Sequence, residues 1–271
     1  MLKFVSLRLL FALILAALLG ACSTIQYVSQ AADGEAEVLN RARPIGELLG
    51  DPTTPPVVAE RLRLAQRIRA FAISELHLPD NGSYTRYADL GREYVLWNVV
   101  STPALSMRPL ESCFPIAGCL AYRGYYKEAE AIRYADERRA AGEDVFMYGI
   151  PAYSTLGWFN DPLLNTTVRY GELAMVRLIF HELSHQLYYV QNDSSFNEAF
   201  ATAVEQEGML RWLEHENKPS VQGRFEQSEA RQKAFHQMMN GARKQLLAVY
   251  GSKDSDAVKL AAKADILKQL A

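Results

Sequence analysis

Apolar residues recur at helical spacing in three long parts of the chain. Over residues 57–76 they alternate with arginines at intervals of three and four, which predicts an amphipathic helix with a solvated basic face. Residues 127–142 are charged and rich in alanine and end at Gly142, as a surface helix would. After about Gly171 the pattern stays helical to the end of the chain. Helices are therefore predicted to dominate the fold.

Short strands are predicted between these helices. Residues 84–102 are rich in Tyr, Val and Trp with Gly91 in the middle, which indicates a β-hairpin. Residues 120–126 and 145–154 have the character of two further strands. We therefore expect an α+β domain, predominantly helical with a small antiparallel sheet, over residues 51–271.

The N-terminus differs from the rest of the chain. Lys3 and Arg8 precede an apolar run that ends at Ala21, too short to cross a bilayer of about 30 Å but typical of a signal peptide in residues 1–21. The run closes in Leu-Gly-Ala-Cys, which resembles the lipobox of bacterial lipoproteins; an ordinary signal peptide with an incidental cysteine is the alternative.

The lipobox resemblance implies that Cys22 is acylated and anchors the protein to a lipid membrane. Residues 22–50 would then form a membrane tether and a first helix. Ser23 after the cysteine resembles lipoproteins sorted to the outer membrane. The expected location is the bacterial cell envelope, with the protein facing the periplasm.

Composition and cysteine count narrow the picture. A formal net charge of −2 with 22% charged residues gives no reason to expect a nucleic-acid partner. Besides Cys22, Cys113 and Cys119 flank a short segment with Pro and Gly, and an oxidising periplasm favours a disulfide between them, worth about 2 kcal/mol. Two buried free thiols are the alternative.

The most informative motif is H-E-x-x-H, from His181 to His185. Apolar residues at helical spacing place the motif on a helix whose buried stripe would contain Val176, Ile179, Phe180, Leu183 and Leu187. Both imidazoles then leave the other face about one turn apart, where they could bind one metal ion. Glu182 would lie beside them as a general base. Two ordinary histidines are the alternative.

A third metal ligand is available in Glu198, twelve residues beyond His185 and near the start of a second helix. A helix–turn–helix would bring it back towards the histidines. The competing interpretation is a capping box, in which Ser195 and Glu198 satisfy backbone donors only.

Other zinc motifs do not fit the spacing. A metzincin would have a third histidine where Gln191 stands and a glycine at Tyr188. We expect the remaining histidines to be surface residues rather than ligands: His77, His215 and His236.

The H-E-x-x-H motif followed by Asn197-Glu198-Ala199-Phe200-Ala201 resembles the gluzincin pattern, above all the Asn-Glu-Gly-Phe-Ala stretch of aminopeptidase N-like enzymes. The spacing is shorter here, and no Gly-Ala-Met-Glu-Asn sequence is present. The whole chain resembles a bacterial family labelled "putative zinc aminopeptidase". The resemblance implies a zincin-like fold, Zn²⁺ held by His181, His185 and Glu198, and Glu182 as base.

Three protein ligands leave one zinc position for water, which marks a catalytic site. The predicted function is therefore a zinc-dependent peptidase, with an aminopeptidase the first choice, in which Glu182 activates the water towards a peptide or protein substrate. Gluzincins normally hold the oxyanion with a Tyr or His, and Tyr148 and Tyr153 are the candidates, with simple packing as the alternative. The competing function is a non-catalytic, zinc-containing envelope lipoprotein that acts as a binding module.

Overall fold

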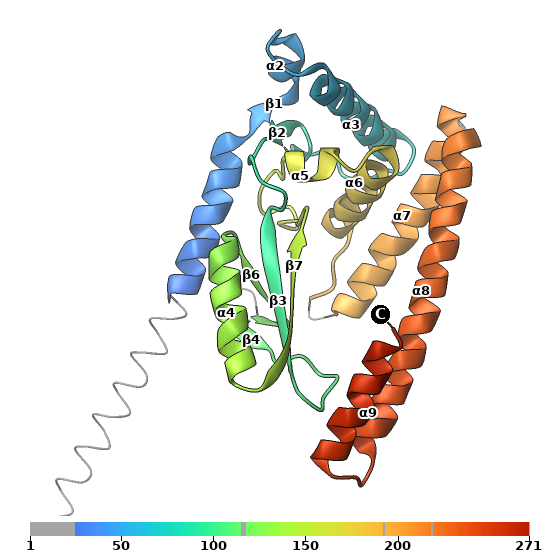
Figure 1. Cartoon of the computed structure of the whole chain (residues 1–271). Coiled ribbons are helices and arrows are strands. Elements are labelled where there is room, and N and C mark those ends of the chain that lie inside the picture. The colour runs from blue at the N-terminus through green and yellow to red at the C-terminus, as the bar shows by residue number, and fades with distance from the viewer. Residues whose placement is uncertain (1–24, 115–117, 192, 218, 271) are drawn as a thin grey trace, which may run out of the picture.

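The computed structural model describes residues 25–114, 118–191, 193–217 and 219–270. The predicted signal peptide and Cys22 lie outside the described residues. Within them the fold is α+β and predominantly helical, as predicted. Helices and small sheets lie side by side, and a long helical pair forms one side of the molecule (Figure 1).

The helical part is built on one buried core. It contains α2 (Ile45–Gly50), α3 (Pro56–Ser74), α5 (Asn165–Val168), α6 (Glu172–Leu187), α7 (Ser194–Glu216), α8 (Pro219–Gly251) and α9 (Asp256–Lys268). The ring of Phe71 on α3 lies 6.0 Å from that of Phe180 on α6 and 5.3 Å from that of Trp212 on α7. These buried rings join the three helices into one unit.

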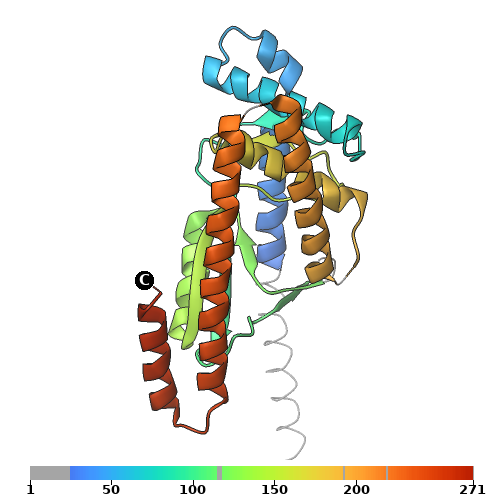
Figure 2. The ribbon, with the colours of Figure 1, turned by 90° about the vertical axis from the view of Figure 1, so that its right-hand side faces the viewer.

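The strands form three small sheets. One has the order β1 (Arg43–Pro44), β2 (Arg86–Ala88), β8 (Leu163–Leu164). The second has the order β6 (Arg123–Tyr125), β3 (Leu96–Pro103), β7 (Glu143–Ile150), and α4 (Glu128–Ala140) packs against it. The third pairs β4 (Ser112–Phe114) with β5 (Gly118–Leu120). Figure 2 shows α8 passing in front of the sheet that contains β3 and β7.

The hairpin predicted over residues 84–102 is wrong. β2 pairs with β1 and, in parallel, with β8, whereas β3 pairs with β6 and β7. The residues between β2 and β3 are bound elsewhere: Asn165 accepts from the Leu90 amide at 2.9 Å and donates to the Arg92 carbonyl at 3.0 Å. Tertiary contacts therefore separate two strands that local sequence would pair.

Residues 25–50, predicted to form a tether and a first helix, are packed into the body of the protein. A helix covers residues 25–41, and Val38 and Ile45 are buried in the core. Gln30 donates to the Gly124 carbonyl at 3.1 Å and accepts from the Tyr126 amide at 3.2 Å. None of the helices within the described residues has the length and apolar character needed to span a membrane.

The structure contains the Cys113–Cys119 disulfide, which joins two residues directly opposite one another in β4 and β5. Both cysteines are exposed, so the alternative of two buried free thiols is wrong.

Candidate metal centre

The H-E-x-x-H motif lies on α6, as predicted. Buried side chains at helical spacing fix this helix against the core, among them Val176, Ile179 and Leu183. Leu187, predicted to continue this stripe, is half-exposed because α6 ends there. The rings of His181 and His185 leave the helix together, with centroids 4.9 Å apart.

The first turn of α7 brings Glu198 to both histidines. Its Oε2 lies 3.3 Å from Nε2 of His181, and its Oε1 lies 3.6 Å from Nε2 of His185. One ligand atom from each of the three residues lies within 4.8 Å of the others. The three predicted ligands therefore meet at one point.

The capping-box alternative for Glu198 is wrong. Asp193 is the N-cap of α7, and its Oδ1 accepts from the Phe196 amide at 3.0 Å. Ser195 lies within the first turn. The carboxylate of Glu198 is thus free to face the histidines.

Asn197 fixes the turn that delivers Glu198. This buried side chain accepts from the Val190 amide and donates to the Val190 carbonyl, each at 2.8 Å. It closes the loop between α6 and α7 and sets where α7 begins. The neighbouring asparagine of the Asn-Glu pair therefore has a structural role in the centre.

Glu205 holds the far side of His181. Its Oε2 lies 3.1 Å from Nδ1 of His181, and its Oε1 lies 3.3 Å from the Arg177 guanidinium. Burial disfavours the charged imidazole, but the hydrogen bond to Glu205 and the surrounding carboxylates leave the pKa of His181 raised. Glu205 was missed in the sequence, although it follows Glu198 by seven residues, about two turns on the same face of α7.

Glu182 lies in a buried polar cluster with residues of the loop after β7. Burial raises the pKa of its carboxyl to about 7, the charges of Asp161 and Glu198 add to the rise, and His181 and a hydrogen bond with Ser154 oppose it. Asp161 in turn accepts from Thr155 Oγ1 at 2.6 Å. Asp161 and Ser154 were missed, and no motif in the sequence marks them.

Gln186 of α6 makes hydrogen bonds to the same cluster. Its Oε1 accepts from Asn81 at 2.7 Å, and its Nε2 lies 3.4 Å from both Ser83 Oγ and Asp161 Oδ2. The buried Tyr84 belongs to the same cluster, because the charges of Glu182 and Asp161 add to the rise that burial causes in its pKa. Glu182 therefore lies in a prearranged polar network.

The donor set fits zinc. Two imidazole nitrogens and one carboxylate oxygen are ligands that catalytic zinc takes, and a zinc-bound histidine commonly gives its other nitrogen to a carboxylate, as His181 does to Glu205. Burial and the neighbouring His181 lower the pKa of His185, which favours the neutral form that binds metals.

The two tyrosines predicted to hold an oxyanion lie in different places. The hydroxyl of Tyr153 donates to Glu35, and its ring packs edge-on against Tyr126 at 6.0 Å, so the structure gives it the packing role. Tyr148 lies on β7 and accepts from Asn98 at 3.5 Å. It is near Tyr122. Burial raises the pKa of Tyr122, and the charges of Tyr148 and Glu198 raise it further.

The other histidines do not join the centre in the part of the chain that the structure describes. His77 has a positive φ of 52° at the turn after α3. His215 packs on the rings of Phe71 and Trp212, and His236 is exposed on α8.

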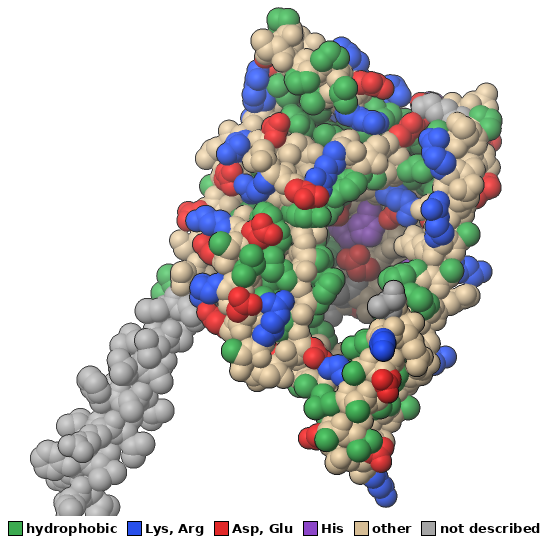
Figure 3. Space-filling model, viewed as in Figure 1, with side chains coloured by type: hydrophobic (Ala, Val, Ile, Leu, Met, Phe, Trp, Pro, Cys, Tyr) green, Lys and Arg blue, Asp and Glu red, His purple; other side chains and the backbone are tan. Residues whose placement is uncertain are grey.

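His181 and Glu182 border a groove of about 470 Å³ between α6, α7 and α8. Figure 3 shows histidine and acidic side chains together in a hollow, with basic side chains on its border. The lining residues come from all three helices: Ala174, Arg177, Leu178, His181, Glu182, Thr202, Glu205, Gln206 and Gln232.

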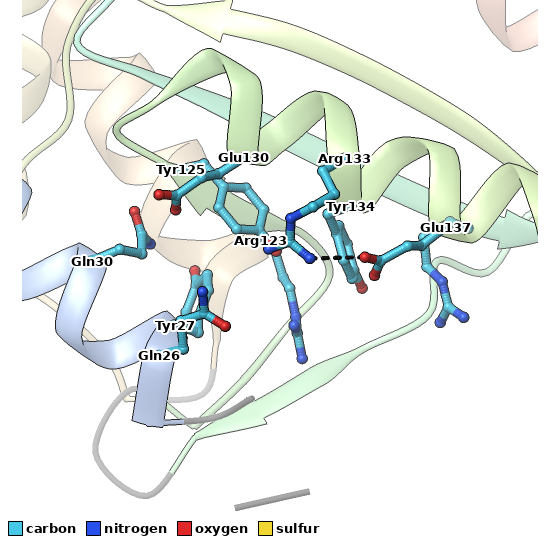
Figure 4. Close-up of a pocket in the computed structure, with 10 residues that line it drawn as sticks. Gln26, Tyr27, Gln30, Arg123, Tyr125, Glu130, Arg133, Tyr134 and Glu137 are labelled. Carbon is cyan, nitrogen blue, oxygen red and sulfur yellow. Dashed lines mark hydrogen bonds and ion pairs between the residues drawn. The ribbon is translucent and has the colours of Figure 1, made fainter. Parts of the chain in front are cut away.

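A separate cavity of about 270 Å³ lies between the first helix and α4 (Figure 4). Its charged groups are engaged locally: Arg133 pairs with Glu137 at 2.8 Å, and the guanidinium of Arg123 lies 4.8 Å from the ring centroid of Tyr134. We interpret this cavity as part of the packing interface between the first helix and the sheet layer.

The fold and the site define an α+β protein in which an H-E-x-x-H helix and the helix after it join two histidines and a glutamate into a candidate metal centre. The chain belongs to the family described as "Putative aminopeptidase", whose sequence profile matches residues 26–271. Membership indicates a peptidase, with peptides as substrates. No curated protein and no solved structure matches the chain.

Proposed function

We propose that this protein is a zinc-dependent aminopeptidase of the gluzincin type with a zincin-like catalytic domain. The observation that carries the proposal is the meeting of His181, His185 and Glu198 within 4.8 Å, with Glu182 in a buried polar cluster beside His181. Membership in the aminopeptidase family supports the choice of a peptide substrate.

The chemistry follows from the residues. Zinc, when bound, would polarise the substrate carbonyl and make a water more acidic. Glu182 accepts the proton from that water as it attacks and returns it to the leaving amine. Ser154 orients the Glu182 carboxylate, and Glu205 fixes the ring of His181.

The proposal includes a location. The lipobox-like sequence that ends at Cys22 supports an acyl anchor in the outer membrane of a bacterial envelope, with the protein facing the periplasm. Labelled-lipid incorporation that is lost in Cys22→Ala would test this anchor.

The metal assignment is tested by metal analysis of the purified protein. We expect about one zinc per chain, and loss of that zinc in His185→Ala because a buried ligand is removed. His236→Ala, which changes an exposed histidine on α8, is the matched control and should keep the metal. Zinc retained by His185→Ala would overturn the ligand set.

The catalytic assignment is tested with Glu182→Gln and a peptide library read by mass spectrometry. This variant should keep zinc and lose about 10²-fold or more of hydrolysis, because the amide cannot accept the proton. The masses of the products show whether the N-terminal residue is released. Zinc without hydrolysis in the unchanged protein would instead favour the non-catalytic binding module.

A further inference from the structure

The long helix α8 is held at its N-terminal part by the helices of the metal centre. Arg177 on α6 pairs with Glu229 and lies 5.5 Å from the ring centroid of Phe225, which is buried. One turn further, Gln232 lines the same groove as His181 and Glu182. This face of α8 is therefore one wall of the groove.

The other end of α8 is held as well. Ala242 and Leu246 are buried, and α9 packs beside them. Lys263 of α9 donates to the Ala104 carbonyl at 2.8 Å and pairs with Asp144 at the start of β7. The helix therefore crosses from the helical core to the far end of the sheet and is held at both ends (Figures 1 and 2).

Between these two ends the inner face of α8 continues but is not covered. Phe225, Gln232, Met239 and Leu246 are spaced by seven residues, about two helical turns, and so share one face. The outer two are buried, whereas Met239 is 42% exposed and Phe235, one turn before it, is 54% exposed. An apolar stretch thus begins directly beyond the groove wall.

We propose that Phe235 and Met239 bind a bulky apolar side chain of an extended polypeptide substrate while its scissile bond lies at the metal centre. The inference rests on the proposed function and adds to it a preference for substrates with an apolar side chain near the cleaved bond. We choose the substrate as the molecule bound here because the apolar stretch is continuous with the groove, whose wall contains Gln232. Met239 lies about 10 Å along the helix from Gln232, which matches about three residues of extended chain.

Gln237 provides the control. It is exposed, and at 100° per residue its side chain lies about 160° from both Phe235 and Met239, on the opposite face of α8. Serine at each of these exposed positions should leave the fold intact, which thermal unfolding verifies.

The test compares peptides that differ only in having Leu or Ser within three residues of the cleaved bond. In the unchanged protein we expect the Leu peptide to be preferred in kcat/KM. The double variant Phe235→Ser/Met239→Ser should reduce that preference about ten-fold or more, mainly through KM, and Gln237→Ser should not.

A binding measurement separates this inference from the proposed function. Fluorescent Leu and Ser peptides are titrated into zinc-loaded Glu182→Gln with and without the α8 substitutions. Selective loss of Leu-peptide binding supports the apolar site even if no hydrolysis is found. A preference for the Leu peptide that the double variant does not change, in hydrolysis or in binding, overturns the inference. Hydrolysis by the unchanged protein in that case leaves the peptidase standing. Absence of peptide binding and of hydrolysis overturns the inference and the proposed function together. If the protein is a dimer that the double variant dissociates, the stretch instead binds a second copy of the chain, and the inference is overturned.

Discussion

His181 is held between two carboxylates, Glu198 at Nε2 and Glu205 at Nδ1. The second contact fixes which nitrogen faces the centre and keeps the ring from rotating. Glu205 is itself held by Arg177, so the orientation of the histidine depends on a chain of charges that reaches α8 through Glu229.

Glu205→Gln should therefore weaken zinc binding about 10- to 100-fold without abolishing it, because the amide keeps the shape of the side chain but loses its charge. Competition with a fluorescent zinc chelator measures the change in Kd. The control is Glu207→Gln, which alters an exposed glutamate on the same helix that pairs only on the surface with Arg211. Equal zinc affinity in Glu205→Gln and the unchanged protein would remove Glu205 from the centre.

At the scale of single residues, the sequence identifies the site residues that belong to a motif and misses those that lie on a separate loop. His181, His185 and Glu198 share one helix–turn–helix, so spacing alone brings them together. Asp161 and Ser154 reach Glu182 from a separate loop whose path depends on tertiary contacts. Tyr153 was predicted near the centre for its position in the chain, but Glu35, far away in sequence, holds its hydroxyl.

At the scale of elements, the close packing of α6 and α7 depends on one glycine. A Cβ at Gly208 of α7 would lie 2.7 Å from the buried ring of Phe180 on α6 and 2.7 Å from Leu76. Because Phe180 precedes His181 directly, this contact sets the distance between the helix of the histidines and the helix of Glu198.

Gly208→Ala should lower the free energy of unfolding by about 1–2 kcal/mol, because overpacking outweighs the gain in helix propensity. Gly241→Ala is the control within α8: a Cβ there meets nothing within 4 Å, so it should stabilise by up to about 1 kcal/mol. Urea unfolding measures both. Stabilisation by both substitutions would show that α6 and α7 tolerate a larger separation.

Long helices follow from periodicity, but strand pairing does not. α3, α4 and the helices after Gly171 lie where the pattern of apolar residues predicts them. β2 and β3 are adjacent in sequence yet belong to different sheets, because Asn165 binds the segment between them. Pairing depends on distant partners that local sequence does not specify.

At the scale of the whole molecule, the cores contain tyrosines that resist ionisation. Burial raises the pKa of Tyr87 to about 12, and burial likewise raises that of Tyr125 to about 12. Their side chains lie in two different cores, one helical and one beside the sheet with β3.

These pKa values predict a loss of stability in alkali. A pKa that is higher in the folded state means that the folded state keeps its proton while the unfolded chain ionises near pH 10. The stabilisation is complete below pH 10 and is lost as the pH rises towards 12. Denaturant unfolding between pH 8 and pH 12 should show this fall, and Tyr87→Phe should make it shallower. An unchanged slope in Tyr87→Phe would contradict the role of that residue.

The first helix also limits how far the catalytic body could move from a membrane. Tyr27 and Gln30 of this helix make hydrogen bonds to Gly124 and Tyr126, so the helix is attached to the rest of the protein from its first described turn. With the acyl anchor that we propose at Cys22, the three peptide units from Cys22 to Ile25, the first described residue, span at most about 11 Å. The enzyme would then stay close to the lipid surface, and its substrates would have to diffuse to that surface.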